Sequence, residues 1–239
     1  MKRFLLSILI LLFYASGFSQ QLSIGVRGGF GMYSMDLLNQ FQQYRTNQVQ
    51  LPLEITESYP ITPFYRGELA LNDIKYIDKI AVFYGFCSTG ARSTVSDYSG
   101  FANLDAVING NQMGLTIQKN LYQKGLWSVA GSVDASYLFS KLKTTDVIEI
   151  YDMENMTEKQ EYSLVANGFA VEPGLVASFR LKPLIFQINL GYLIDYSKNL
   201  HLEGDKDMVL GVNNKAIKPQ WTGLRLGLQV SYLFKKSKE

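Results

Sequence analysis

Few residues of this chain have side chains suited to catalysis, and most of them lie around one histidine. His201, the only histidine in 239 residues, is followed by Glu203, Asp205 and Asp207. A hydrolase would need this imidazole beside a serine nucleophile and an orienting carboxylate. No local motif brings a serine to His201, so a solvated loop is the simpler interpretation. We predict no catalytic residues.

The same acidic residues could offer oxygen ligands to calcium, but their spacing differs from that of an EF-hand loop. A solvated acidic turn is the better interpretation. The single cysteine, Cys87, excludes a disulfide framework and a cysteine-based zinc cluster. Neither a phosphate-binding P-loop nor a dinucleotide-binding glycine motif is present. The sequence therefore predicts no metal site and no cofactor.

A second group of charged residues lies within stretches where apolar and polar residues alternate. Its members stand on the polar side of that alternation: Arg27, Arg66, Glu68, Asp134, Glu172 and Arg225. Charges in a narrow interior are costly unless they are paired. Our hypothesis is that arginines on one wall of a barrel bridge its lumen to carboxylates on the other wall and block it. The alternative is that ordered water hydrates each charge separately.

Eight segments alternate with a period of two, as strands with two different faces do. They are residues 22–32, 64–71, 80–89, 112–118, 127–139, 168–179, 186–195 and 223–234. The three arginines fall on the first, second and eighth segments, which become neighbours when a barrel closes. Asp134 and Glu172 fall on the fifth and sixth, on the opposite wall. We therefore predict an all-β fold class, an eight-stranded antiparallel up-and-down transmembrane barrel.

The connections between these segments alternate in length. Those at 72–78, 119–125 and 180–184 are short, whereas those at 34–63, 90–106, 142–160 and 197–220 are long. Short periplasmic turns and long extracellular loops are typical of outer-membrane barrels. Because eight strands leave an interior that side chains fill, an open diffusion pore is not expected.

Two of the long loops are candidates for binding a partner. In 34–63, Ser34 or Asp36 could cap a short helix that covers the barrel mouth or lies at the lipid interface. In 142–160, alternation over 147–151 predicts that the fifth strand continues upward into a raised hairpin. Such a hairpin would present a free strand edge to an extracellular or envelope protein. A mobile loop is the alternative.

Alternation alone does not separate a membrane barrel from a soluble one, whose apolar face turns inward. The polar face here carries Gly, Ser, Ala, Thr and Gln with isolated charges, and the lysines fall in turns, loops, strand ends or the tail. Aromatic residues gather near the strand ends: Trp127, Phe179, Phe186, Tyr232 and Phe234 on the turn side, and Tyr137, Phe139, Tyr196 and Trp221 on the loop side. Belts of this kind mark lipid interfaces. We therefore predict that the apolar face contacts outer-membrane lipid.

The N-terminal segment resembles an export signal. Positive charge in residues 1–3 precedes the apolar run 4–14, and small and polar residues follow. We predict a cleaved signal peptide at 1–19, a barrel domain at 20–234 and a short charged periplasmic tail at 235–239. An uncleaved membrane anchor is the alternative. The near-balanced charge, 23 basic against 21 acidic residues, argues against a nucleic-acid partner.

Three stretches resemble a known family. The closing segment 224–234, the opening 24–31 and the stretch 169–174 are similar to the porin-like and PorT-like outer-membrane barrels of Bacteroidota. The resemblance implies the fold and the outer-membrane location. It implies no activity, because most members have none assigned.

The function that we favour from the sequence is non-enzymatic: a contribution to envelope structure, or partner binding through the loops. A narrow channel for small solutes is the runner-up. An outer-membrane lipid-modifying enzyme that uses His201 is a third possibility.

Overall fold

The computed structural model describes residues 21–49, 51–74, 76–98, 100–151, 156–212 and 215–234. The predicted signal peptide at 1–19 and the tail at 235–239 lie outside these residues. Within them, no helix has the length and apolar character needed to cross a membrane.

Eight strands form a closed ring in which all neighbours are antiparallel, as predicted. In order around the ring they are β1 (Gln21–Tyr33), β3 (Thr62–Asn72), β4 (Lys79–Asp97), β5 (Gly100–Lys124), β6 (Trp127–Ile150), β7 (Met156–Leu181), β8 (Leu184–Ser197) and β13 (Gly223–Leu233). Pairing of β13 with β1 closes the ring. Phe234 N donates to Leu22 O at 2.9 Å, so the two ends of the described barrel meet at one rim.

The alternation predicts which side chains point outward. Along β13, Leu224, Leu226, Leu228 and Val230 are exposed, whereas Arg225 and Gln229, which alternate with them, are buried. Large apolar side chains on the other ring strands are exposed in the same way, among them Ile24, Val26, Leu115, Val133 and Leu190. The outside of the ring is therefore a broad apolar surface.

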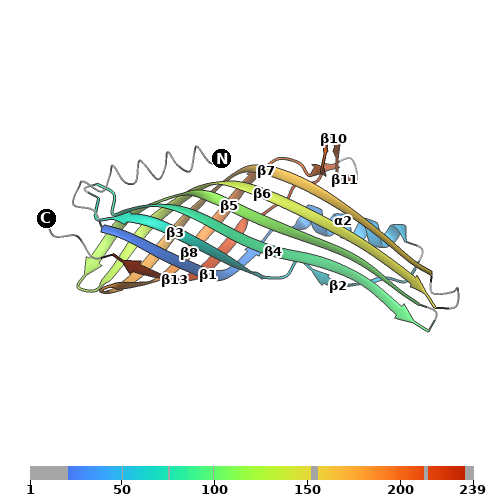
Figure 1. Cartoon of the computed structure of the whole chain (residues 1–239), viewed down its shortest axis with the longest axis horizontal. Helices are drawn as coiled ribbons and strands as arrows, with labels where there is room; N and C mark the ends of the chain where they lie inside the picture. The colour runs from blue at the N-terminus through green and yellow to red at the C-terminus, as the bar shows by residue number, and fades with distance from the viewer. Residues whose placement is uncertain are drawn as a thin grey trace.

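The rim near Gln21 and Phe234 has short connections, as predicted. Only Gly125 and Leu126 separate β5 from β6, and the positive φ of Gly125, 60°, suits a tight turn. At the other rim β4 to β7 continue past the barrel body, as Figure 1 shows. In this raised sheet, β6 reaches Ile150 and β7 begins at Met156, which confirms that the fifth predicted strand extends upward.

One predicted loop is wrong. Residues 90–106 are strand over most of their length, because β4 runs to Asp97 and β5 starts at Gly100. Their glycine, serine and threonine content resembles that of a loop. The small inward-facing side chains, such as Ala91, Ser93 and Ala102, instead leave room for the helix that packs over them.

The other two long connections fold over the mouth of the ring. The first contains helix α2 (Asp36–Gln48) and strand β2 (Glu54–Ser58), which pairs with β4. The last contains four short strands: β9 (His201–Leu202), β10 (Asp205–Val209), β11 (Gly211–Val212) and β12 (Lys215–Ala216). Their buried side chains join inward-facing residues of the ring in one apolar cluster, which includes Leu38, Ile108, Leu142, Leu200 and Trp221.

This cluster corrects two predictions. The buried charges lie in the barrel body, and beneath the loops the interior is largely a hydrophobic core. Trp221, which we expected in an aromatic belt, is fully buried. Its indole donates to Ser140 Oγ at 2.9 Å, and its ring meets Tyr33 edge-on at 5.1 Å between centroids.

Helix α2 exists as predicted, but neither Ser34 nor Asp36 caps it. Its N-cap residue is Met35, and no side chain within the segment makes a capping bond. The buried side of α2 includes Leu38, Phe41 and Gln42. The amide of Gln42 donates to Ser93 and to the carbonyl of Leu104 at 2.8 Å each. The helix therefore lies against the inner face of β4 and β5.

Candidate functional site

The six charged residues predicted for the interior all lie inside the ring. Each is between 4% and 7% exposed. Arg27 comes from β1, Arg66 and Glu68 from β3, and Arg225 from β13, while Asp134 and Glu172 come from β6 and β7. The alternation of each strand turns them inward.

Arg66 reaches from β3 across the interior to Asp134 on β6 and forms an ion pair with it. The same guanidinium donates to Thr116 and lies 3.5 Å from the centre of the Phe83 ring. Since β4 and β5 stand between β3 and β6 in the ring, this contact bridges separate parts of the wall.

Arg225 makes a second bridge, from β13 to β7. Its Nη1 lies 3.1 Å from Glu172 Oε2 and donates to Gln112 Oε1 at 2.9 Å. Its Nε donates to the hydroxyl of Tyr33 at 3.0 Å. A guanidinium with several fixed acceptors holds one orientation, so this bridge fixes the positions of three strands and Tyr33.

Glu68 is the centre of a third group of contacts. It pairs with Lys79, lies 3.5 Å from Arg66 Nη2, and accepts from Gln229 Nε2 at 2.6 Å. Arg27 donates from Nε to Gln229 Oε1 at 3.0 Å, and its Nη1 is 3.9 Å from Asp134 Oδ2. These contacts join the lower interior into one network.

Sequence reasoning missed Lys79 as a member of this network. The alternation places Lys79 at a strand end, yet its side chain is buried beside Glu68. Extending the inward parity of the third segment from Ala81 by two residues would have placed Lys79 inside.

The residues around His201 lie apart from the interior network. His201 pairs with Val165 in the short β9–β7 contact, and its Nδ1 is 3.5 Å from the carbonyl oxygen of Asn199. Glu203 forms an ion pair with Lys141, and Asp205 accepts from the backbone of Asp207. Over the described ranges, no three His, Cys, Asp or Glu side chains are grouped as metal ligands.

Cys87 points inward and is buried. Its Sγ lies 3.7 Å from the carbonyl oxygen of Gly110. It packs within the apolar cluster beneath the loops. This environment is that of a small apolar side chain rather than of a reactive thiol.

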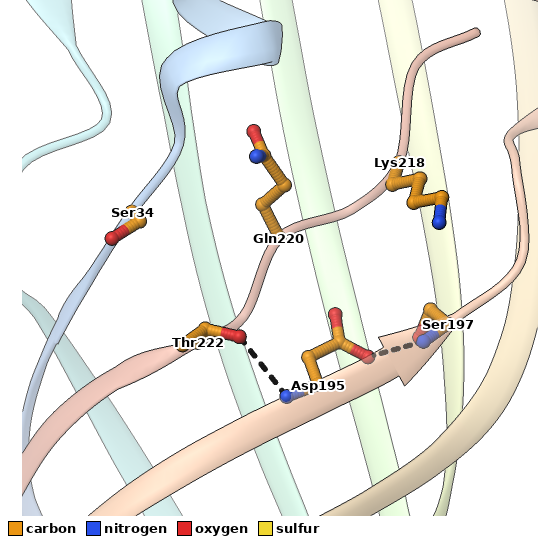
Figure 2. A pocket seen from close by; sticks show the side chains of 6 residues that line it. All are labelled: Ser34, Asp195, Ser197, Lys218, Gln220 and Thr222. Carbon is orange, nitrogen blue, oxygen red and sulfur yellow. Dashed lines mark hydrogen bonds between the residues drawn. The ribbon is translucent and has the colours of Figure 1, made fainter.

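A small polar pocket of about 170 Å³ lies where β8 and β13 part near the loops. Figure 2 shows the six side chains around it: Ser34, Asp195, Ser197, Lys218, Gln220 and Thr222. Asp195 accepts from the backbone of Ser197 and of Trp221, and Thr222 accepts from the backbone of Asp195. The pocket has room for about five or six water molecules.

Gln220 gives this region a structural role, because its side chain caps helix α2. Its Oε1 accepts from Leu37 N at 2.8 Å, in place of the cap that Ser34 or Asp36 would have supplied. Replacing Gln220 by Ala is expected to destabilise α2 by about 1 kcal/mol, the usual value of a capping bond.

Such a loss corresponds to roughly fivefold faster cleavage after Arg45 by trypsin, measured by mass spectrometry on the folded chain. Gln220→Glu retains the acceptor oxygen and is the matched control, with an unchanged rate expected. An unchanged rate in Gln220→Ala would show that tertiary packing alone holds the helix.

The outer face of the raised sheet carries exposed ion pairs. Glu161 contacts Lys159 and Lys143 at 2.7 and 2.9 Å, and both ammonium groups lower the pKa of its carboxyl below the ordinary value. Arg92 donates to Asp105, which raises the pKa of the guanidinium. This face is suited to water.

Comparisons with known proteins show structural similarity to solved structures. No protein-family profile matches the sequence, and no curated protein matches it. Among solved structures, a major outer membrane protein from Thermus thermophilus is similar, with TM-score 0.48, 13% identity, and coverage of 91% of this chain and 100% of that chain.

Ail, the attachment invasion locus protein of Yersinia pestis, is also similar. Its complex with the heparin analogue sucrose octasulfate gives TM-score 0.33 at 12% identity, and Ail alone gives 0.32 at 13%. Each alignment covers 90% of this chain and 97% of the other.

Proposed function

We propose that this protein is a non-enzymatic bacterial outer-membrane β-barrel that is exported through its N-terminal signal. The observation that carries the proposal is the outward face of the ring, where residues such as Val26, Leu115 and Leu228 are 51% to 69% exposed. Soluble monomers rarely expose apolar patches larger than a few hundred Å². Lipid is the solvent that suits this surface, and the resemblance of residues 224–234 to Bacteroidota porin-like barrels agrees with it.

The interior network supports a closed barrel rather than a channel. The Arg66–Asp134 ion pair bridges β3 to β6 across the interior, the Arg225–Glu172 pair joins β13 to β7 over the intervening β8, and the apolar cluster with α2 lies above them. A solute would have to separate buried ion pairs and displace packed side chains. The function that remains for such a barrel is to strengthen the envelope or to bind a partner through its loops.

The partner-binding part of this proposal concerns residues 34–63 and 142–160. Of these, the raised sheet offers the more accessible surface. On the β7 side of this sheet, backbone pairing with β9 involves Leu164 and Val165, and residues 157–162 beyond them are exposed. An extended segment of an extracellular or envelope protein could add to this edge as a further strand.

Conductance in a planar bilayer tests the closed interior. The purified protein is expected to give no steady large-channel current, because buried ion pairs and packed side chains occupy the interior. Electrophoresis of the same sample with and without boiling shows whether the barrel is folded, since a folded membrane barrel migrates differently until heated. A steady current from heat-shifting material would establish the channel function instead.

A further inference from the structure

The interior network has an excess of positive charge. Within the residues that the structure describes, seven charged side chains are more than nine-tenths buried. Four are cations (Arg27, Arg66, Lys79 and Arg225) and three are anions (Glu68, Asp134 and Glu172). An uncompensated charge in such an interior is strongly unfavourable. A guanidinium cannot relieve this by losing its proton, and the contact of Lys79 with Glu68 favours its charged form.

The excess charge can be assigned to one place. Arg225 lies 3.1 Å from Glu172, and Lys79 and Arg66 are in direct contact with Glu68 and Asp134. Arg27 has only a distant carboxylate, Asp134, at 3.9 Å, and Arg66 already occupies that carboxylate. Arg27 is therefore the cation without a carboxylate of its own.

The strand register increases the electrostatic repulsion around Arg27, because Arg27 on β1 is directly opposite Arg66 on β3. Like charges in directly opposed cross-strand positions repel each other. Arg66 Nε is also buried without a hydrogen-bond acceptor within the described chain. Asp134 is thus shared by the two facing guanidiniums, Arg66 has Glu68 as a second carboxylate at 3.5 Å, and Arg66 Nε is a buried donor without an acceptor.

We propose that the Arg27–Arg66 pair binds a small monovalent inorganic anion inside the barrel. One such anion would balance the charge, four against four, and would accept a hydrogen bond from Arg66 Nε, the buried donor of this pair that has no partner. Chloride is the simplest ion with this charge and size. The site would make the anion a structural part of the closed interior, and it depends on the fold and not on whether the barrel conducts.

Melting of the folded barrel in detergent tests this, with the loss of the heat-shifted band as the measure. Sodium gluconate is replaced stepwise by sodium chloride at constant ionic strength. We expect a saturable rise in melting temperature, of about 5 °C or more when chloride reaches about a hundredfold its dissociation constant. A flat response in the unmodified protein would overturn the proposal.

Two variants make the result specific to Arg27. Arg27→Gln removes the excess cation, so it should lose the chloride response and, in gluconate, melt above the unmodified protein. Arg27→Lys retains the charge and should retain a chloride response. An equal response in Arg27→Gln would indicate a general salt effect and contradict the site.

Crystals of the unmodified protein grown in bromide give a second measurement that does not depend on either variant folding. An anomalous peak in contact with the Arg27 or Arg66 guanidinium is expected, and its absence would also overturn the proposal. Because both measurements start from folded barrel, failure here leaves the membrane placement and closed interior of the proposed function intact.

Discussion

Asp134→Ala is expected to lower the free energy of unfolding by about 3–5 kcal/mol, because it leaves buried guanidinium charge unpaired. Asp134 contacts Arg66 directly and is the nearest carboxylate to Arg27. Arg27 would lose its nearest carboxylate, and Arg66 would keep only the more distant Glu68, 3.5 Å away. Urea unfolding in lipid vesicles, monitored by the heat-shifted band, measures the change.

The control for this loss is an ion pair outside the ring. Lys119 lies 3.5 Å from Asp78, and its side chain is 58% exposed. Lys119→Gln should therefore change the unfolding free energy by less than about 1 kcal/mol. If Asp134→Ala changed the free energy of unfolding as little as Lys119→Gln, the interior charges would be separately hydrated. The ion-pair network would then not be the feature that closes the barrel.

The second large effect concerns the outward face, and strand β6 provides a matched comparison. Val133 and Thr145 have the same outward parity on this strand, Val133 in the barrel body and Thr145 in the raised sheet. Val133→Arg should destabilise the inserted barrel by about 2–4 kcal/mol, the cost of arginine near the middle of the bilayer. Thr145→Arg should stay within about 0.5 kcal/mol, as for a surface position in water.

The folding yield into vesicles and the urea midpoint of unfolding are measured for both variants. These two quantities show whether lipid or water surrounds the ring at each level. Equal tolerance of the two arginines would mean that water surrounds the ring at both levels. In that case the soluble-barrel alternative would be correct, and the exposed apolar surface would need a protein partner to cover it.

The eight-stranded ring could be predicted because the pattern that identifies each strand lies within the sequence of that strand. A period-two pattern identifies a strand and its two faces without knowledge of its neighbours, and the inward positions of Arg27, Arg66 and Asp134 follow from it. The pairing of strands one, two and eight then follows from closure. The individual contacts do not, since they depend on the stagger between strands, which sets the level at which each side chain lies.

The part above the barrel body could not be predicted because its pattern depends on tertiary packing. Residues such as Ala91 and Ser93 resemble loop residues until α2 is placed over them. Trp221 resembles an interface aromatic until Ser140 and Tyr33 are known to surround it. Gln220 caps a helix that begins almost two hundred residues earlier, a relation for which no sequence pattern exists.

The covered mouth has a consequence for engineering this protein as a display scaffold. The connections after β1 and after β8 contribute buried side chains such as Leu38 and Leu200 to the apolar cluster, so foreign peptides inserted there would disrupt its packing. The β4–β5 hairpin ends in a solvent-exposed turn where Tyr98 is 94% exposed. An inserted epitope should be tolerated at that tip, carried away from the membrane by the raised sheet.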